Sequence, residues 1–146
     1  MLWNPARSDR SDDTARPGKR EVAMSLLALK AYGKLIEFDL CLFGGKFESL
    51  YARVRSCQVR RKASGIDIEQ VCRAVDVAAI WYPKRVLCLQ RSAANVCLLR
   101  AHGFPAQLVL GAQKLPFKAH AWVEVQGQVV GDRSYVQEIY AVLDRC

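Results

Sequence analysis

Residues 88–110 decide the fold, and they read CLQRSAANVCLLRAHGFPAQLVL. The first fourteen positions repeat apolar side chains at helical spacing, and Gly103 follows as the left-handed residue that commonly lies just beyond a helix. After Gly103 the spacing changes, and residues 107–110 have the pattern of a strand. We therefore predict a helix over Cys88–His102 that leads directly into the first strand of a sheet.

The rest of the chain extends this order of helices first and strands afterwards. Earlier helices are predicted over 21–43, about 47–61 and 67–82, ended in turn by Gly44-Gly45, Ser64-Gly65 and Pro83. Two more strands are predicted over 119–125 and 128–131, and the tail 135–143 is apolar enough to pack back on the core. The expected fold class is α+β, with N-terminal helices and a small antiparallel sheet.

Composition excludes several classes of protein. The chain has 146 residues, is 51% hydrophobic and carries a net charge of +8. This length and composition are typical of one globular domain and exclude a disordered or a fibrous chain. Residues 1–20 are polar and basic, so we predict a disordered segment there and a single domain over 21–146. No stretch resembles a secretory signal or an uninterrupted membrane span.

The six cysteines form no C-x-x-C pair, and only two histidines accompany them. We therefore predict no metal site and no other cofactor. We expect a cytoplasmic location and reduced thiols, most of them small buried hydrophobes.

Three residues have the chemistry and the chain order of a cysteine hydrolase. Cys88 lies in the first turn of a predicted helix, where unpaired amides and the helix dipole favour a thiolate. His120 begins a strand on which it shares a face with Trp122, and we expect that face to meet the helix so that Trp122 covers the site. Asp132, at the end of the next strand, can accept the second ring proton of His120. His102 is excluded as the base because it lies about 20 Å away at the other end of the helix.

The turn before Asp132 decides whether that carboxylate and His120 lie on one face. A two-residue loop, Gln126-Gly127, puts the two side chains on opposite faces of the hairpin. A three-residue loop that also includes Val125 and ends in a left-handed glycine puts them directly across from each other. Because the triad hypothesis needs the second arrangement, we predict a three-residue loop.

Four motifs carry a specific resemblance: Cys88-Leu-Gln-Arg-Ser92, Leu98–Ala106, Pro116–Val125 and Val130-Gly-Asp132. Together they resemble the transglutaminase-like cysteine peptidases of lasso-peptide biosynthesis, the B-type leader peptidases. The resemblance implies a papain-like, transglutaminase-like core in which Cys88 is the nucleophile, His120 the base and Asp132 the orienting acid. Arg91 and Ser92 match the family motif too, and we expect Arg91 and Trp122 to contact substrate.

The resemblance also implies partners. We expect the stand-alone peptidase of a split system, which cleaves the leader from a precursor peptide with a separate leader-binding protein. An asparagine-synthetase-like cyclase then closes the macrolactam. The alternatives are an inactive transglutaminase-like scaffold and an acyltransferase in which an amine replaces water.

A basic run over residues 53–62 has three interpretations, which are a solvated helix face, a docking surface for an acidic leader or partner protein, and nucleic-acid binding. No recognition motif supports the last, so we expect no nucleic-acid partner.

Overall fold

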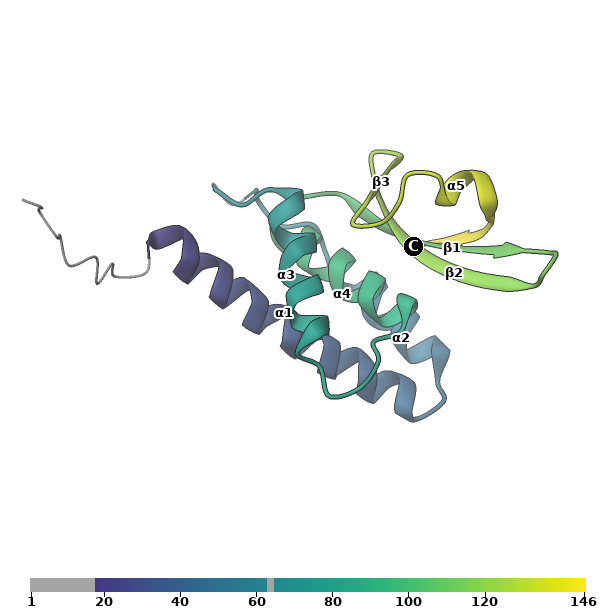
Figure 1. The fold of residues 1–146 in the computed structure, drawn as a ribbon, viewed down its shortest axis with the longest axis horizontal. Coiled ribbons are helices and arrows are strands. Elements are labelled where there is room, and N and C mark those ends of the chain that lie inside the picture. The colour runs from purple at the N-terminus through teal and green to yellow at the C-terminus, as the bar shows by residue number, and fades with distance from the viewer. Residues whose placement is uncertain (1–17, 63–64) are drawn as a thin grey trace, which may run out of the picture.

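The computed structural model describes residues 18–62 and 65–146. Four helices come first, α1 (Lys19–Phe43), α2 (Phe47–Ser56), α3 (Ile68–Ile80) and α4 (Cys88–Ala101). Strands β1 (Ala106–Gln113), β2 (Lys118–Val125), β3 (Gln128–Val130) and β4 (Ala141–Arg145) follow, with a short helix α5 (Val136–Ile139) before β4. The strands form one antiparallel sheet in the order β3-β2-β1-β4, and the helices α1 to α4 lie together on one side of it (Figure 1). The predicted α+β fold class is confirmed.

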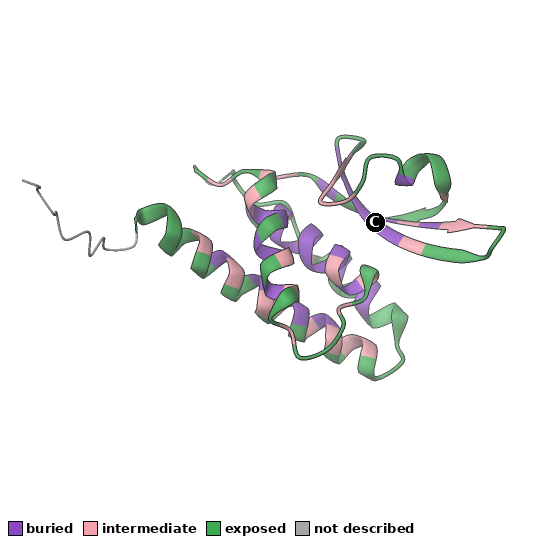
Figure 2. Cartoon of the chain, in the orientation of Figure 1, coloured by how far each residue is buried: buried purple, intermediate pink, exposed green. Residues whose placement is uncertain are grey.

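Helix α4 is the centre of the core. It packs against α1 and α3 and against strands β1 and β2, and it is buried along most of its length (Figure 2). Two neighbouring small residues, Ala93 and Ala94, are fully buried, which allows the neighbouring elements to approach the helix closely. The position of Cys88, at the first residue of α4, is therefore fixed by the best-packed element of the domain.

Helix α1 contributes one buried stripe to this core. Leu27, Ala31, Leu35 and Phe38 recur at helical spacing and are at most 3% exposed. The amide of Gln90 on α4 donates to the Leu35 carbonyl at 2.8 Å, so a buried polar group joins the two helices.

The second helix ends five residues earlier than predicted, at Ser56. The carbonyl of Val54, which a longer helix would pair with residue 58, instead accepts from the Arg100 guanidinium at 2.9 Å. The same guanidinium donates to the Cys57 carbonyl, and the amide of Arg60 donates to the Arg100 carbonyl at 2.8 Å. The prediction of one basic helix face over 53–62 is therefore wrong, because its second half is an extended segment that runs beside α4.

Cys57 and Cys97 form a disulfide that joins this extended segment to α4, with their Cα atoms 5.4 Å apart. The expectation that all six thiols are reduced is therefore wrong, and cysteine usage gives no argument for a reducing compartment. The spacing could not reveal the pair, because the two residues meet only through the early end of α2. The remaining cysteines are free: Cys41, Cys72, Cys88 and Cys146.

The two ends of the domain also differ from expectation. Helix α1 begins at Lys19, so the predicted segment 1–20 overlaps it by two residues, and residues 1–17 lie outside the described part of the chain. In the tail, Val136 is buried as expected, but residues 141–145 pair with β1 as a fourth, exposed edge strand. Over residues 18–62 and 65–146, no helix is long and apolar enough to cross a membrane.

We predict that Phe38→Ala destabilises the domain by about 3–5 kcal/mol, because it leaves a cavity where α1 meets the core. Phe117→Ala is the matched control, since the Phe117 side chain is 76% exposed in the β1–β2 turn, and its effect should stay within about 0.5 kcal/mol. Urea unfolding followed by circular dichroism measures both changes. Equal losses would contradict this description of the core.

Candidate active site

Cys88 is exposed at the first residue of α4. The preceding Leu87 occupies the cap position and offers no side-chain acceptor to the first-turn amides. These amides, and the positive end of the helix dipole, are therefore free to stabilise negative charge at or near the sulfur. The first turn of α4 also contains no acidic residue that would oppose a thiolate.

His120 and Asp132 are hydrogen bonded. The Nε2 atom of His120 lies 2.7 Å from Oδ2 of Asp132, while Oδ1 of Asp132 accepts from the Arg133 amide at 2.7 Å. Both side chains of the pair are about one quarter exposed, so they are shielded from bulk water without being sealed off. The carboxylate thus has one oxygen fixed by the backbone and the other directed at the imidazole.

Cys88, His120 and Asp132 line one small cavity of about 20 Å³, roughly the space of a single water molecule. The cavity wall also includes Asn95, whose buried Oδ1 atom has no hydrogen-bond partner. The structure therefore brings the three predicted residues to one site at the junction of α4, β2 and the segment after β3.

The turn that precedes Asp132 is not the predicted one. Val125 pairs with Gln128, so the loop has two residues, Gln126 and Gly127, with φ of 51° and 78°. Positive φ at both central positions is typical of a type I′ turn. The prediction of a three-residue loop is therefore wrong.

Asp132 reaches His120 by a different route. Strand β3 stops at Val130, and Gly131 adopts a left-handed conformation with φ of 67°. Beyond that residue the alternation of faces along a strand no longer applies, so Asp132 can turn toward the His120 side. A Cβ atom at Gly131 would lie 2.9 Å from Sγ of Cys72, so the close approach to α3 also requires a glycine.

Arg91 holds this turn in place. Its Nη2 atom donates to the Gly131 carbonyl at 2.9 Å, and its Nε atom donates to Oδ1 of Asp76 on α3 at 2.8 Å. The guanidinium therefore joins α3, α4 and the residue directly before Asp132. These bonds turn the side chain toward the protein, although it also lines the cavity.

The face of β2 that packs on α4 is the opposite of the one predicted. Ala121 and Val123 belong to the main core, and the Ser92 hydroxyl of α4 donates to the Ala121 carbonyl at 2.9 Å. Trp122 is fully buried on the other face, packed with Val109 and with Val136 of α5. The expectation that Trp122 covers the site from the α4 side is therefore wrong, because the smaller side chains fit the space against α4.

Trp122 instead supports His120 from behind. The two rings are stacked with their centroids 6.3 Å apart, and the ring of Tyr140 lies 5.3 Å from His120. Gly111, directly across from His120 on β1, makes room for them, since a Cβ there would lie 2.6 Å from the Trp122 ring. The imidazole is thus held between aromatic side chains on one side and Asp132 on the other.

Glu124 is a buried residue of this region that sequence reasoning did not single out. It is 3% exposed and accepts hydrogen bonds from the Trp122 indole at 2.9 Å, from Gln137 at 2.8 Å and from Arg145 at 2.8 Å. The carboxylate therefore fixes the orientation of the indole behind His120. The available signal was the alternation along β2, which puts Glu124 on the same face as Trp122 and His120.

The comparisons with known proteins agree with this arrangement. A family model described as the transglutaminase-like superfamily matches residues 35–145. The chain belongs to the transglutaminase-like superfamily. It is also 38% identical over 56 residues to the microcin J25-processing protein McjB of Escherichia coli, a match that covers 38% of this chain and 27% of that protein. No solved structure matches this chain significantly.

The family match confirms the predicted transglutaminase-like core, and the similarity to the processing protein supports the resemblance to the B-type leader peptidases. The stretch aligned to that relative spans only about a quarter of its length. Within the described ranges, no group of three or more His, Cys, Asp or Glu side chains is arranged to hold a metal ion.

We predict that Gly131→Ala destabilises this transglutaminase-like domain more than Gly127→Ala. Both substitutions impose a left-handed conformation on alanine, which costs about 1–2 kcal/mol. Only Gly131→Ala also meets Cys72, whereas a Cβ at Gly127 has open space, so overpacking adds about 1–3 kcal/mol. Equal free energies of unfolding in urea would show that the contact with Cys72 is unimportant.

We also predict that iodoacetamide at neutral pH alkylates Cys88 well before Cys72. Burial, with Asp76 nearby, raises the pKa of the Cys72 thiol to about 11, so this thiol stays protonated and shielded at pH 7. Cys88 is exposed at a helix start. Peptide mass spectrometry over a time course measures the order of labelling, and labelling of Cys72 first would contradict the structure.

Proposed function

We propose that this protein is a cysteine peptidase that removes the leader from a lasso-peptide precursor. One observation carries the proposal, which is the exposed Cys88 thiol at a helix start beside an imidazole already bonded to a carboxylate. The alternative of an inactive scaffold gives no reason to keep a reactive thiol, an oriented histidine and its acid at one cavity.

The hydrogen bond to Asp132 assigns the two ring nitrogens of His120 to different tasks. With Nε2 held by the carboxylate at 2.7 Å, the proton stays on that nitrogen and Nδ1 is left as the basic atom. Nδ1 takes the proton of the Cys88 thiol, which leaves a thiolate and an imidazolium stabilised by Asp132. The aromatic rings of Trp122 and Tyr140 behind the imidazole restrict its rotation. Cys88 and His120 line the same cavity, which supports this transfer.

The reaction then proceeds in two stages. The thiolate attacks the scissile carbonyl, the imidazolium protonates the leaving amine, and the leader remains bound to Cys88 as a thioester. Water then loses a proton to Nδ1 and attacks the thioester, which releases the leader as a carboxylate and restores the thiol. Amides in the first turn of α4, that of Cys88 included, are the oxyanion donors, and one such donor is worth about 10²–10³ in rate.

Arg91 and Trp122 act in this mechanism as positioning residues, and both also line the Cys88 cavity. Arg91 fixes the carbonyl next to Asp132, and the fully buried Trp122 packs behind His120. The expectation that both contact the peptide stays a prediction.

The partners of the reaction follow from the resemblance alone. The processing activity of the microcin J25 relative supports a precursor peptide as substrate. A separate leader-binding protein and an asparagine-synthetase-like cyclase complete the proposed system, in which the free amine released here becomes the nucleophile of ring closure.

The proposal is tested with Cys88→Ala on a lasso-peptide precursor, in the presence of a leader-binding protein. We expect cleavage to vanish, whereas Cys41→Ala, which removes another free thiol outside the site, should cleave normally. His120→Ala should lower the rate by about 10²–10⁴ because it removes the general base. Mass spectrometry of the products measures all three.

Two outcomes would reject the proposal. Cleavage by Cys88→Ala at the wild-type rate would show that the thiol is not the nucleophile. A product with the mass of an amide in place of a free carboxylate on the leader would identify an acyltransferase instead.

A further inference from the structure

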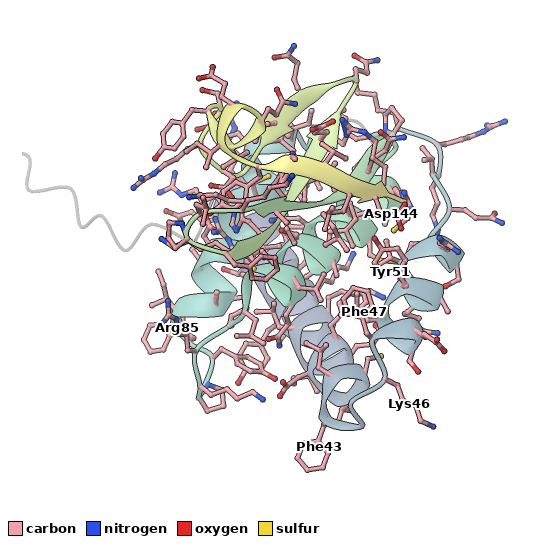
Figure 3. The ribbon with its side chains drawn as sticks, turned by 90° about the vertical axis from the view of Figure 1, so that its right-hand side faces the viewer. Phe43, Lys46, Phe47, Tyr51, Arg85 and Asp144 are labelled. Atoms are coloured by element: carbon pink, nitrogen blue, oxygen red, sulfur yellow. A yellow bond between two sulfur atoms is a disulfide. The ribbon has the colours of Figure 1, made fainter. Side chains whose placement is uncertain are left out.

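Two buried side-chain oxygens among the described residues have no hydrogen-bond partner, Oη of Tyr51 and Oδ1 of Asn95. Buried polar atoms are nearly always paired, so each of these two needs an explanation. Tyr51 lines a cavity together with Asp144 of the edge strand β4, and the two side chains lie close to each other (Figure 3). Burial, with this carboxylate nearby, raises the pKa of Tyr51 to about 12, so the hydroxyl keeps a proton and has an acceptor at hand.

Asn95 is placed differently, on the face of α4 that carries the thiol. It follows Cys88 by seven residues, or two helical turns, so the two side chains lie on one face about 10 Å apart along the axis. Side chains of a helix lean toward its N-terminus, so the Asn95 amide is directed back toward Cys88. Asn95 is 3% exposed and forms part of the wall of the Cys88 cavity. A buried acceptor therefore lies in the same cavity as the thiol.

The neighbouring polar side chains on α4 do not satisfy this oxygen. The Ser92 hydroxyl also lines the cavity, but it donates to the Ala121 carbonyl. The Arg91 guanidinium donates to Asp76 and to the Gly131 carbonyl. The cavity of about 20 Å³ has room for one water molecule, and buried waters occupy sites where protein atoms would otherwise stay unpaired.

We propose that Asn95 binds the water molecule that hydrolyses the thioester at Cys88. The inference rests on the peptidase chemistry proposed above and adds a residue to its second stage. A water molecule held between two acceptors, Oδ1 of Asn95 and Nδ1 of His120, must donate one hydrogen to each. Its lone pairs are then left free for the carbonyl carbon on the sulfur.

The hydrolytic step balances without a further reactant. The water oxygen bonds to the thioester carbon while one of its protons moves to Nδ1 of His120. The bond between that carbon and the Cys88 sulfur breaks, and the imidazolium returns the proton to the sulfur. Asn95 holds the second hydrogen of the water and is unchanged. In the first stage the thiolate is the nucleophile, so the loss of Asn95 should slow the second stage alone.

The variant Asn95→Leu tests this role, because leucine has a similar size and no acceptor, which favours normal folding. The activated ester p-nitrophenyl acetate acetylates Cys88 without any need for peptide recognition. Release of p-nitrophenolate measures acetylation, and protein and peptide mass spectrometry measures the loss of the acetyl group from Cys88. We expect acetylation close to the wild-type rate and hydrolysis slower by about 10–100-fold, so that acetylated Cys88 accumulates.

Two controls separate a lost water from a damaged helix. Hydroxylamine attacks the thioester itself, so it should remove the acetyl group from Asn95→Leu and from the wild type at equal rates. Val96→Ala alters a fully buried side chain of α4 that does not line the cavity. This variant should be less stable to urea but should not accumulate acetylated Cys88.

The outcomes distinguish this inference from the peptidase proposal. Hydrolysis by Asn95→Leu at the wild-type rate overturns the role of Asn95, as does an equal slowing of both stages. A wild-type Cys88 that takes up no acetyl group rejects the peptidase chemistry itself and this role with it. A crystal structure of the wild-type protein should show a water molecule bonded to Oδ1 of Asn95. A cavity without this water overturns the inference even where Asn95→Leu fails to fold.

Discussion

The bond from the Ser92 hydroxyl to the Ala121 carbonyl is the contact on which the site depends. It joins α4 to β2 one turn after Cys88 and one residue after His120, so it sets the distance between the helix that carries the thiol and the strand that carries the imidazole. It is buried, and a buried carbonyl that lost this donor would remain unsatisfied. This gives a physical reason for the serine that follows Arg91 in the sequence. Arg91 completes the same face of α4 by fixing the carbonyl next to Asp132.

Much of the fold could be predicted because glycine and proline residues in the local sequence mark the ends of its helices. Helices α3 and α4 end two residues and one residue before their predicted ends, close to Pro83 and Gly103, and β2 ends at the predicted residue. The end of α2 could not be predicted, since Arg100, distant in sequence, takes the carbonyls that a longer helix would use. Edge strand β4 was missed for a similar reason, because its pairing depends on a free edge of β1 that the tail sequence does not reveal.

The candidate triad was predicted by residue type and chain order, but the reasons given for its geometry were wrong. The expected turn and the expected face of β2 both differ from the structure, and Asp132 still reaches His120. The prediction extended the alternation of side-chain faces along the strand to Asp132. The left-handed conformation of Gly131 ends the strand before that residue. The alternation along β2 indicated the face on which Glu124 lies, but its burial could not be predicted, because two of its partners come from α5 and β4.

Helix α1 affects the candidate site through its buried face. That face packs on α4, whose first residue carries the thiol. The amide of Gln90 on α4 donates to the Leu35 carbonyl at 2.8 Å, so the position of α1 and the first turns of α4 are fixed together. A buried carbonyl that lost this donor would remain unsatisfied. Since no described α1 residue lines the Cys88 cavity, α1 acts on the thiol through the packing of α4 and not by contact with the reacting atoms.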